Sequence, residues 1–125
     1  MKKNESENKI LTVCNLNYLS DLMGGKKHLI KKIMNTFLVQ VPEELKSINH
    51  ATAIADYSTI KNLAHTMKSS VSILGISIVL PILQEMEGLG AKGTSIERIM
   101  VLNQQLNFIC MQAFEELEKE KKHYS

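Results

Sequence analysis

Apolar residues recur at helical spacing through most of this chain, and glycine and proline are few. The clearest stretch is residues 57–74, where an advance of about 100° per residue gathers the apolar side chains into an arc of roughly 100°. The residues in this arc are Ile60, Leu63, Ala64, Met67, Val71 and Leu74. No alternating apolar pattern with turn residues competes with this interpretation, so the sequence predicts an all-α protein.

Short connections between long amphipathic segments are typical of an antiparallel helical bundle. We therefore expect an antiparallel four-helix bundle with a short extra N-terminal helix. The short helix should run from about Asn17 to Met23, where two glycines stop it. The expected bundle helices are Lys26 to about Ala53, with a kink or a restart at Val41-Pro42, then Tyr57 to Leu74, Ile78 to Gly88, and Ile96 to Leu117.

Local signals mark where these helices begin and end. Asp56 can cap the second bundle helix, and Gly75 closes it. Ser77 can cap the third helix, and residues 88–93 are expected to form a glycine-rich loop after it. Residues 94–97, Thr-Ser-Ile-Glu, fit a capping box for the last helix.

A chain of 125 residues, 44% of them hydrophobic, suits one domain with one core. We expect a flexible lead-in at 1–12, the bundle at 13–118 and a charged tail at 119–125. The polar start lacks the apolar segment of a signal peptide, and no apolar run is long enough to span a bilayer. We therefore expect a cytoplasmic protein without membrane insertion, in which Cys14 and Cys110 are reduced thiols.

Charge and motifs exclude several classes of function. The net charge is only +2 and Arg98 is the one arginine, whereas readers of DNA base edges favour arginine, so no nucleic-acid partner is expected. The sequence has no glycine-rich phosphate loop, no GxGxxG motif and no HExxH pair. Its histidines and cysteines are not spaced like metal ligands, so we predict no resident cofactor and no metal site.

His65 lies opposite the apolar arc, at the centre of a polar face. Lys61, Lys68, Ser69 and Ser72 fall within roughly 60° of it on the helical wheel. Histidine can carry a phosphoryl group on one ring nitrogen, and an acceptor on the other nitrogen then fixes the tautomer. A lysine one turn away can attract the phosphoryl oxygens. The simpler alternative is a solvated surface histidine without a chemical role.

Residues 63–70, Leu-Ala-His-Thr-Met-Lys-Ser-Ser, and the pair Leu74-Gly75 resemble the histidine-containing phosphotransfer (HPt) domain family. The family pattern is a histidine, a lysine three residues later, small residues after the lysine, and Leu-Gly ten residues from the histidine. The similarity covers roughly Leu22 to Leu117. It also includes Phe37, Pro42, Leu45 and Asp56.

The resemblance implies that His65 accepts a phosphoryl group from a receiver-domain aspartate and passes it to another receiver aspartate in two-component signal transduction. The domain would be a phosphohistidine carrier without kinase activity of its own. Its partners would be response regulator receiver domains and a hybrid sensor histidine kinase, and we expect a monomer. The receiver domain would supply the Mg²⁺.

The resemblance also assigns roles to individual residues. Glu87 would hold the inner ring nitrogen of His65, with Gln84 as the second choice, and Lys68 would bind phosphate. The expected partner-binding residues are Lys61, Ser69, Ser72, Ile73 and Gly75. Two departures stand out. Ser69 occupies a position where the family more often has glycine, and no arginine lies near the histidine, which leaves Lys68, Lys61 and Lys92 to supply positive charge.

Three other hypotheses stay open at this point. The chain could be a non-catalytic bundle that binds receiver domains while His65 is silent. It could be an enzyme that uses His65 as a general base, which would need a pocket and a partner nucleophile. It could also be the histidine-bearing part of a kinase that phosphorylates its own chain, which would need an ATP-binding domain.

Overall fold

A computed structural model describes residues 13–124, in which helices account for nearly all of the chain. The first described helix is α2 (Asn17–Leu22). The long helices are α3 (Lys27–Ala53), α4 (Tyr57–Ile73), α5 (Leu80–Lys92) and α6 (Ile96–Glu120), and the short 3₁₀-helices are η1 (Ser77–Val79) and η2 (Lys121–Tyr124). Residues 13–124 contain no strand, in agreement with the predicted all-α class.

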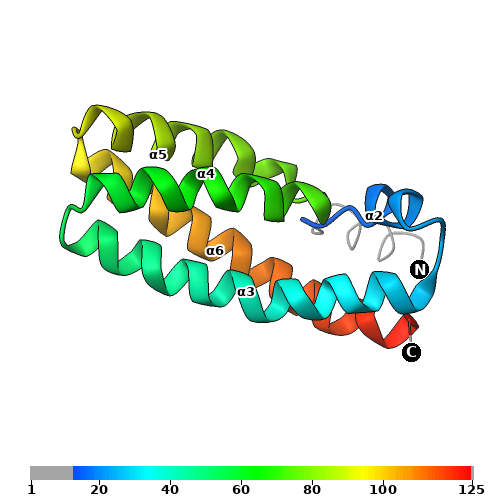
Figure 1. The fold of residues 1–125 in the computed structure, drawn as a ribbon. Coiled ribbons are helices and arrows are strands. Elements are labelled where there is room, and N and C mark those ends of the chain that lie inside the picture. Colours follow the sequence, from blue (N-terminus) through cyan, green and yellow to red (C-terminus); the bar gives the residue numbers. More distant parts are fainter. Residues whose placement is uncertain (1–12, 125) are drawn as a thin grey trace, which may run out of the picture.

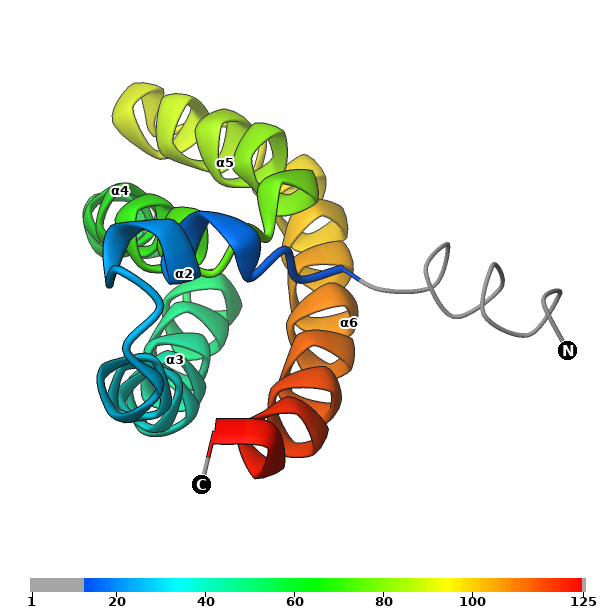
Figure 2. The same ribbon diagram turned by 90° about the vertical axis from the view of Figure 1, so that its right-hand side faces the viewer.

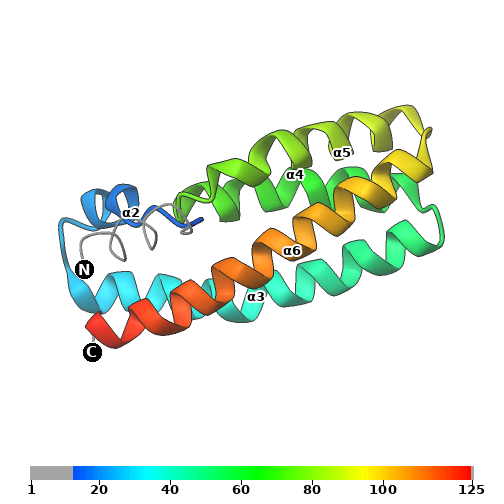
Figure 3. The same cartoon turned by 180° about the vertical axis from the view of Figure 1, so that it is seen from behind.

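Each long helix runs antiparallel to the one that precedes it along the chain, so α3 and α5 point one way and α4 and α6 the other (Figure 1). Seen from behind, α6 passes between α3 and α5 (Figure 3). The short α2 lies at the end of the bundle where α4 ends and α3 begins (Figure 2). Its Leu19 is fully buried, which anchors this helix to the bundle. The predicted four-helix bundle with an extra N-terminal helix is confirmed.

Each long helix contributes one apolar stripe to the core. Burying a large aliphatic or aromatic side chain stabilises the fold by about 1.5–3 kcal/mol, so these stripes decide which face of each helix turns inward. Phe37 of α3 meets Phe114 of α6 edge-on, with ring centroids 6.0 Å apart. The arc predicted for α4 is buried in the structure, apart from the partly buried Leu63, and its fully buried members are Ile60, Ala64, Met67, Val71 and Leu74.

A kink or a restart is expected at Val41-Pro42, and the restart is wrong, because α3 continues through Pro42 from Lys27 to Ala53. A proline inside a helix removes one backbone hydrogen bond and costs about 3 kcal/mol in isolation. Here Phe37, Val41 and Leu45 are buried on either side of the proline. Their packing holds both halves in one helix and offsets the local penalty.

The expected loop at 88–93 is also wrong, because α5 extends through two glycines to Lys92. The helix ends at Gly93, whose φ of +64° gives the left-handed conformation common after a helix end. Gly90 is buried against the backbone of α4. Helix propensity predicts a break at these glycines, but the contact between α4 and α5 keeps the segment helical.

The caps agree only in part with the sequence. Asp56 caps α4 as predicted, because its carboxylate accepts hydrogen bonds from the backbone N–H of Thr59 at 3.2 Å and from the Thr59 hydroxyl at 2.6 Å. Ser77 lies inside η1, which begins without a side-chain cap. Ser95 precedes α6 with a φ of +63° and makes no capping hydrogen bond, so the predicted capping box is wrong.

Glu116 on α6 anchors the first described residues of the chain to the bundle. Its carboxylate accepts hydrogen bonds from the backbone N–H groups of Val13 at 2.8 Å and Cys14 at 2.9 Å. Cys14 and Cys110 are free thiols. Burial, together with the nearby Glu116 carboxylate, raises the pKa of Cys14, and burial raises the pKa of Cys110 to about 12.

The C-terminal part is more helical than the sequence indicates. The charged segment predicted as a tail from residue 119 begins inside α6, and η2 follows and lies against α3. The predicted lead-in at 1–12 falls outside the described residues. Within residues 13–124, no helix is both long and apolar enough to cross a membrane.

Candidate functional site

His65 stands in the middle of α4 on the side away from the core. Its side chain is 69% exposed, whereas the neighbouring Ala64 is fully buried. The placement follows directly from the helical period, because the apolar arc of α4 must face the core and His65 lies opposite that arc. The ring is therefore open to a partner and does not line an enclosed cavity.

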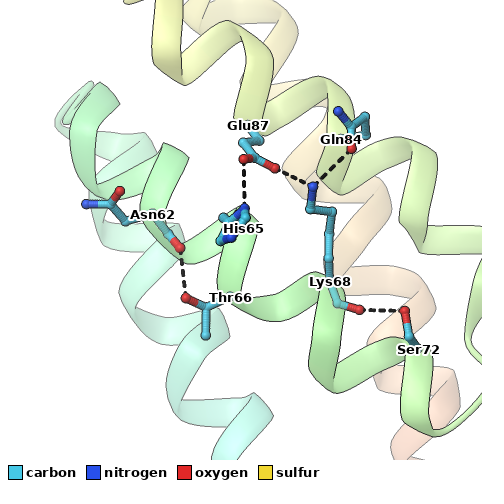
Figure 4. A network of polar contacts seen from close by, with 7 residues as sticks. All are labelled: Asn62, His65, Thr66, Lys68, Ser72, Gln84 and Glu87. Carbon is cyan, nitrogen blue, oxygen red and sulfur yellow. Dashed lines mark hydrogen bonds and ion pairs between the residues drawn. The ribbon is translucent and has the colours of Figure 1, made fainter.

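Glu87, on α5, holds the inner nitrogen of this ring. The distance from His65 Nδ1 to Glu87 Oε2 is 2.9 Å, which is a hydrogen bond (Figure 4). Glu87 is the residue that the family resemblance assigns to this contact. Its side chain is only 23% exposed, since it lies in the seam between α4 and α5.

Lys68 bends back toward α5 and does not extend into the solvent. Its side chain is 25% exposed, and its Nζ lies 2.6 Å from Oε1 of Glu87 in an ion pair. The same Nζ donates a hydrogen bond to Oε1 of Gln84 at 3.0 Å (Figure 4). Gln84, named from the sequence as the second choice for orienting His65, thus contacts Lys68.

The charge of Glu87 determines which nitrogen of His65 is free. Contact with Lys68, and to a lesser degree with His65, lowers the pKa of Glu87 against the opposing effect of desolvation. Glu87 is therefore a carboxylate near neutral pH and can only accept hydrogen bonds. The Nδ1 of a neutral His65 ring must then carry the proton, which leaves the lone pair on Nε2 pointing outward.

The structure places the other predicted residues around this centre on α4 and just after it. Ser69 and Ser72 are exposed, and the Ser72 hydroxyl donates a hydrogen bond to the backbone oxygen of Lys68 at 2.7 Å. Ile73 is 37% exposed and offers an apolar contact. Lys61 is half-buried because its backbone lies against Gly90.

Gly75 differs from the other predicted partner-binding residues. Its φ of +66° is a left-handed conformation, and a Cβ at this position would collide with the backbone oxygen of Asn15. Asn15 also donates a backbone hydrogen bond to the oxygen of Leu74 at 3.1 Å. Gly75 thus ends the helix in a left-handed conformation and also allows the chain at Asn15 to approach closely. The side of Gly75 that a side chain would occupy is covered by the chain itself.

Sequence reasoning missed two features of the site. One is the contact of Gln84 with Lys68, and the other is the close approach at Gly90. Spacing carried a signal for both, because Gln84, Glu87 and Gly90 are three residues apart and so share one face of a helix. The interpretation of residues 88–93 as a loop hid this signal.

Among residues 13–124, no three histidine, cysteine or acidic side chains lie close enough together to form a metal site. Glu87, the carboxylate that contacts His65, already binds His65 through one oxygen and Lys68 through the other. The arrangement instead presents one exposed imidazole nitrogen, an oriented ring and a nearby ammonium group. This set can attack an electrophile and hold a negatively charged group beside the ring.

Comparison with known proteins gives a consistent picture. The family model described as Hpt domain matches residues 32–119. A solved structure, histidine-containing phosphotransfer protein B (HptB) from Pseudomonas aeruginosa PAO1, superposes with a TM-score of 0.82 at 19% sequence identity. The alignment covers 90% of this chain and 97% of that one. The search of curated proteins found no match.

Proposed function

The chain belongs to the Hpt domain family, whose activity is histidine phosphotransfer in two-component phosphorelays, and we propose that His65 is its phosphorylated residue. The single observation that carries this assignment is the geometry of the ring. Its side chain is 69% exposed, and its Nδ1 is 2.9 Å from a carboxylate. A nucleophile must be both reachable and held in one tautomer, and His65 meets both requirements.

In the proposed reaction the lone pair of His65 Nε2 attacks the phosphorus of an aspartyl phosphate on a receiver domain. An N–P bond forms, the bond between phosphorus and the aspartate oxygen breaks, and the aspartate leaves as a carboxylate. Nδ1 keeps its proton, which stays hydrogen-bonded to Glu87. Transfer onward reverses these steps, because a carboxylate oxygen of the next receiver attacks phosphorus and the electron pair of the N–P bond returns to Nε2.

Lys68 is proposed to stabilise the phosphorylated state. Its Nζ lies between Glu87 and Gln84, both on α5, and Glu87 is also the residue that holds the ring. A charged donor beside the phosphoryl oxygens offsets the added negative charge more strongly than a neutral donor could. Movement of the ammonium group from Gln84 toward the phosphoryl group would make this contact.

We propose that the receiver domain brings the Mg²⁺ for the transfer. Glu87 could bind a metal ion only by releasing His65 and Lys68, which would free the ring to turn. The domain would act as a monomer, would have no kinase activity of its own and would work in the cytoplasm, an environment that suits its two free thiols. Response regulators and a hybrid sensor histidine kinase are the proposed partners.

The docking surface is proposed to surround His65 on the outer face of α4. Ser69, Ser72 and the partly exposed Ile73 extend this face toward the C-terminal end of α4, and Lys61 extends it toward the start. Small serines allow a bulky partner to approach the ring, and Ile73 can supply an apolar anchor. Signalling contacts of this kind are usually small and short-lived.

The test is transfer of radiolabelled phosphate from phosphorylated receiver domains to the wild-type chain and to His65→Gln. We expect an acid-labile, base-stable label on the wild type and none on the variant. The unfolding free energy of the variant should stay within about 0.5 kcal/mol of the wild type, because the side chain is mostly exposed. His50→Gln, which changes another exposed histidine, should keep full transfer.

Label that persists on His65→Gln would overturn the assignment of this residue. Receiver binding without any transfer to the wild type would instead favour the non-catalytic receiver-binding bundle. Incubation of the chain alone with labelled ATP should leave it unlabelled, and incorporation there would contradict the proposed lack of kinase activity.

A further inference from the structure

Three contacts follow one another along the seam between the antiparallel helices α4 and α5. Gln84 meets Lys68, Glu87 meets His65, and Gly90 meets the backbone of Lys61. Successive contacts are about one turn apart on each helix, since the residues on α5 advance by three while those on α4 recede by three or four. Side chains make the first two contacts, whereas at the third the backbone of α5 lies directly against the backbone of α4.

Gly90 leaves no space for a side chain at this point. A Cβ built on it would lie 2.9 Å from the backbone oxygen of Tyr57 and 3.0 Å from the backbone nitrogen of Lys61. Both neighbours are main-chain atoms of α4, so neither can rotate out of the way. Any larger residue must push α5 away from α4. Glycine is also a poor helix former, so its presence inside α5 calls for a reason in packing.

The contact that depends on this separation is the one between Glu87 and His65. Gly90 lies one turn after Glu87 on α5, and Lys61 lies one turn before His65 on α4. The bond from Nδ1 to Oε2 measures 2.9 Å, and a hydrogen bond is lost when its length approaches 3.6 Å. A shift of several tenths of an ångström at Gly90 would therefore be felt at the ring.

We propose that Gly90 is a positioning residue for His65, because it sets the distance between α4 and α5 at which Glu87 holds the ring. This inference rests on the proposed function of His65 and deepens it. Gly90 touches neither phosphate nor partner, and its effect acts through the position of the Glu87 carboxylate. The role depends on the absence of a side chain at residue 90. The sequence motif around His65 does not include this position.

The chain offers a matched control for the test. Gly88 lies on the same helix two residues earlier, and a Cβ there would meet nothing within 4 Å. Gly90→Ala and Gly88→Ala make the same chemical change, so any difference between them reports the contact with α4. Circular dichroism and urea unfolding establish that each variant is folded before it is compared.

The first measurement is the tautomer of the neutral His65 ring by ¹⁵N NMR. We expect the wild type and Gly88→Ala to carry the proton on Nδ1, and Gly90→Ala to shift it toward Nε2. Phosphotransfer by Gly90→Ala should fall by about tenfold to a hundredfold, the usual consequence of a small misplacement in an active site. Wild-type tautomer and rate in a folded Gly90→Ala would overturn the proposal.

A second variant keeps the test decisive if Gly90→Ala does not fold. Glu87→Asp withdraws the carboxylate by one methylene while Gly90 stays in place, and it should reproduce the tautomer shift and the slower transfer. A wild-type tautomer and rate in Glu87→Asp would show that the separation is not critical, against the proposal. The tautomer needs no phosphate donor, so a failure of the proposed function, seen as missing transfer in the wild type, is distinguishable from a failure of this inference.

Discussion

Among the polar contacts that join helices in residues 13–124, two bridges differ in their chemistry. The charged bridge consists of His65 and Lys68 on α4 with Gln84 and Glu87 on α5. The amide bridge joins α3 and α6 through three asparagines. Its members are Asn49, Asn103 and Asn107. One bridge changes its charge with pH or with phosphate, and the other cannot.

The amide bridge is short and reciprocal. Asn103 and Asn107 both donate to the side-chain oxygen of Asn49, at 2.7 Å and 2.9 Å, and Asn49 donates back to Asn107 at 3.1 Å. Asn103 is only 9% exposed, so its amide depends on these partners. A neutral network of this kind fixes how two helices face each other without offering a reactive group.

The comparison shows that a bridge between helices can serve either the fold or the chemistry. Which of the two it serves depends on whether its side chains can change their charge or bind a phosphoryl group. In the charged bridge, a phosphoryl group on His65 would compete with Glu87 and Gln84 for Lys68. In the amide bridge nothing competes. Substitutions in the first should therefore change transfer, and substitutions in the second should change stability.

The largest expected effect comes from Lys68→Met. We expect phosphotransfer to fall about tenfold or more, because a hydrogen bond from a charged group contributes about 1.5–3 kcal/mol. The unfolding free energy should change by less than about 1 kcal/mol, as for other ion pairs near the surface. Lys46→Met on α3, which alters net charge equally, should leave the transfer rate unchanged, and equal losses in both variants would contradict a local role.

A smaller effect, of the opposite kind, is expected from Asn103→Ala. Loss of this amide leaves Asn49 with fewer partners and should lower the unfolding free energy by about 1–3 kcal/mol, measured by urea denaturation. The transfer rate below the unfolding transition should not change. Asn35→Ala, at an exposed position of α3, should stay within about 0.5 kcal/mol of the wild type. Slower transfer by a fully folded Asn103→Ala would remove the distinction between the bridges.

The smallest expected effect is the dependence of stability on pH. The folded protein lowers the pKa of Glu87 below its usual value in an unfolded chain, so the folded state binds fewer protons in this range. The stabilisation by Glu87 is complete above that value and is lost as the pH falls through the folded pKa. Acid unfolding of Glu87→Gln should therefore show a smaller drop in stability than that of the wild type.

The amide bridge provides the contrast for this measurement. Asn103→Ala removes no titratable group, so its loss of stability should be the same at every pH. Asp56 and Glu85, whose pKa values are also lowered in the folded state, contribute to the acid response of both variants and cancel in the comparison. A pH profile of Glu87→Gln parallel to that of the wild type would show that the ion pair adds no stability.

The sequence predicts the fold class because each helix carries its own apolar stripe. The face of α4, its cap at Asp56 and the exposure of His65 follow from residues within that helix. The continuation of α3 through Pro42 and of α5 through Gly90 could not be predicted in the same way. Local propensity favours a break at both positions, and burial against other helices outweighs it.

The candidate site likewise has residues that can be predicted from one helix and residues that depend on packing between helices. His65 and Lys68 can be placed on one face from their spacing, and the family resemblance indicates Glu87 for the contact that the structure contains. Gln84 and Gly90 act across the seam, and their partners are set by the register of α5 against α4. That register depends on the packing of two helices, which neither helix encodes alone.

The two native cysteines have a practical consequence for studying the exchange of partners. Thiol-reactive dyes attack the thiolate, and Cys14 and Cys110 both have raised pKa values that keep them protonated near neutral pH. A cysteine introduced beside the histidine, as in Ser69→Cys, would therefore take up a fluorophore selectively. Because the two native cysteines react poorly with such dyes, neither has to be replaced before labelling. The binding and release of a receiver domain could then be followed by fluorescence.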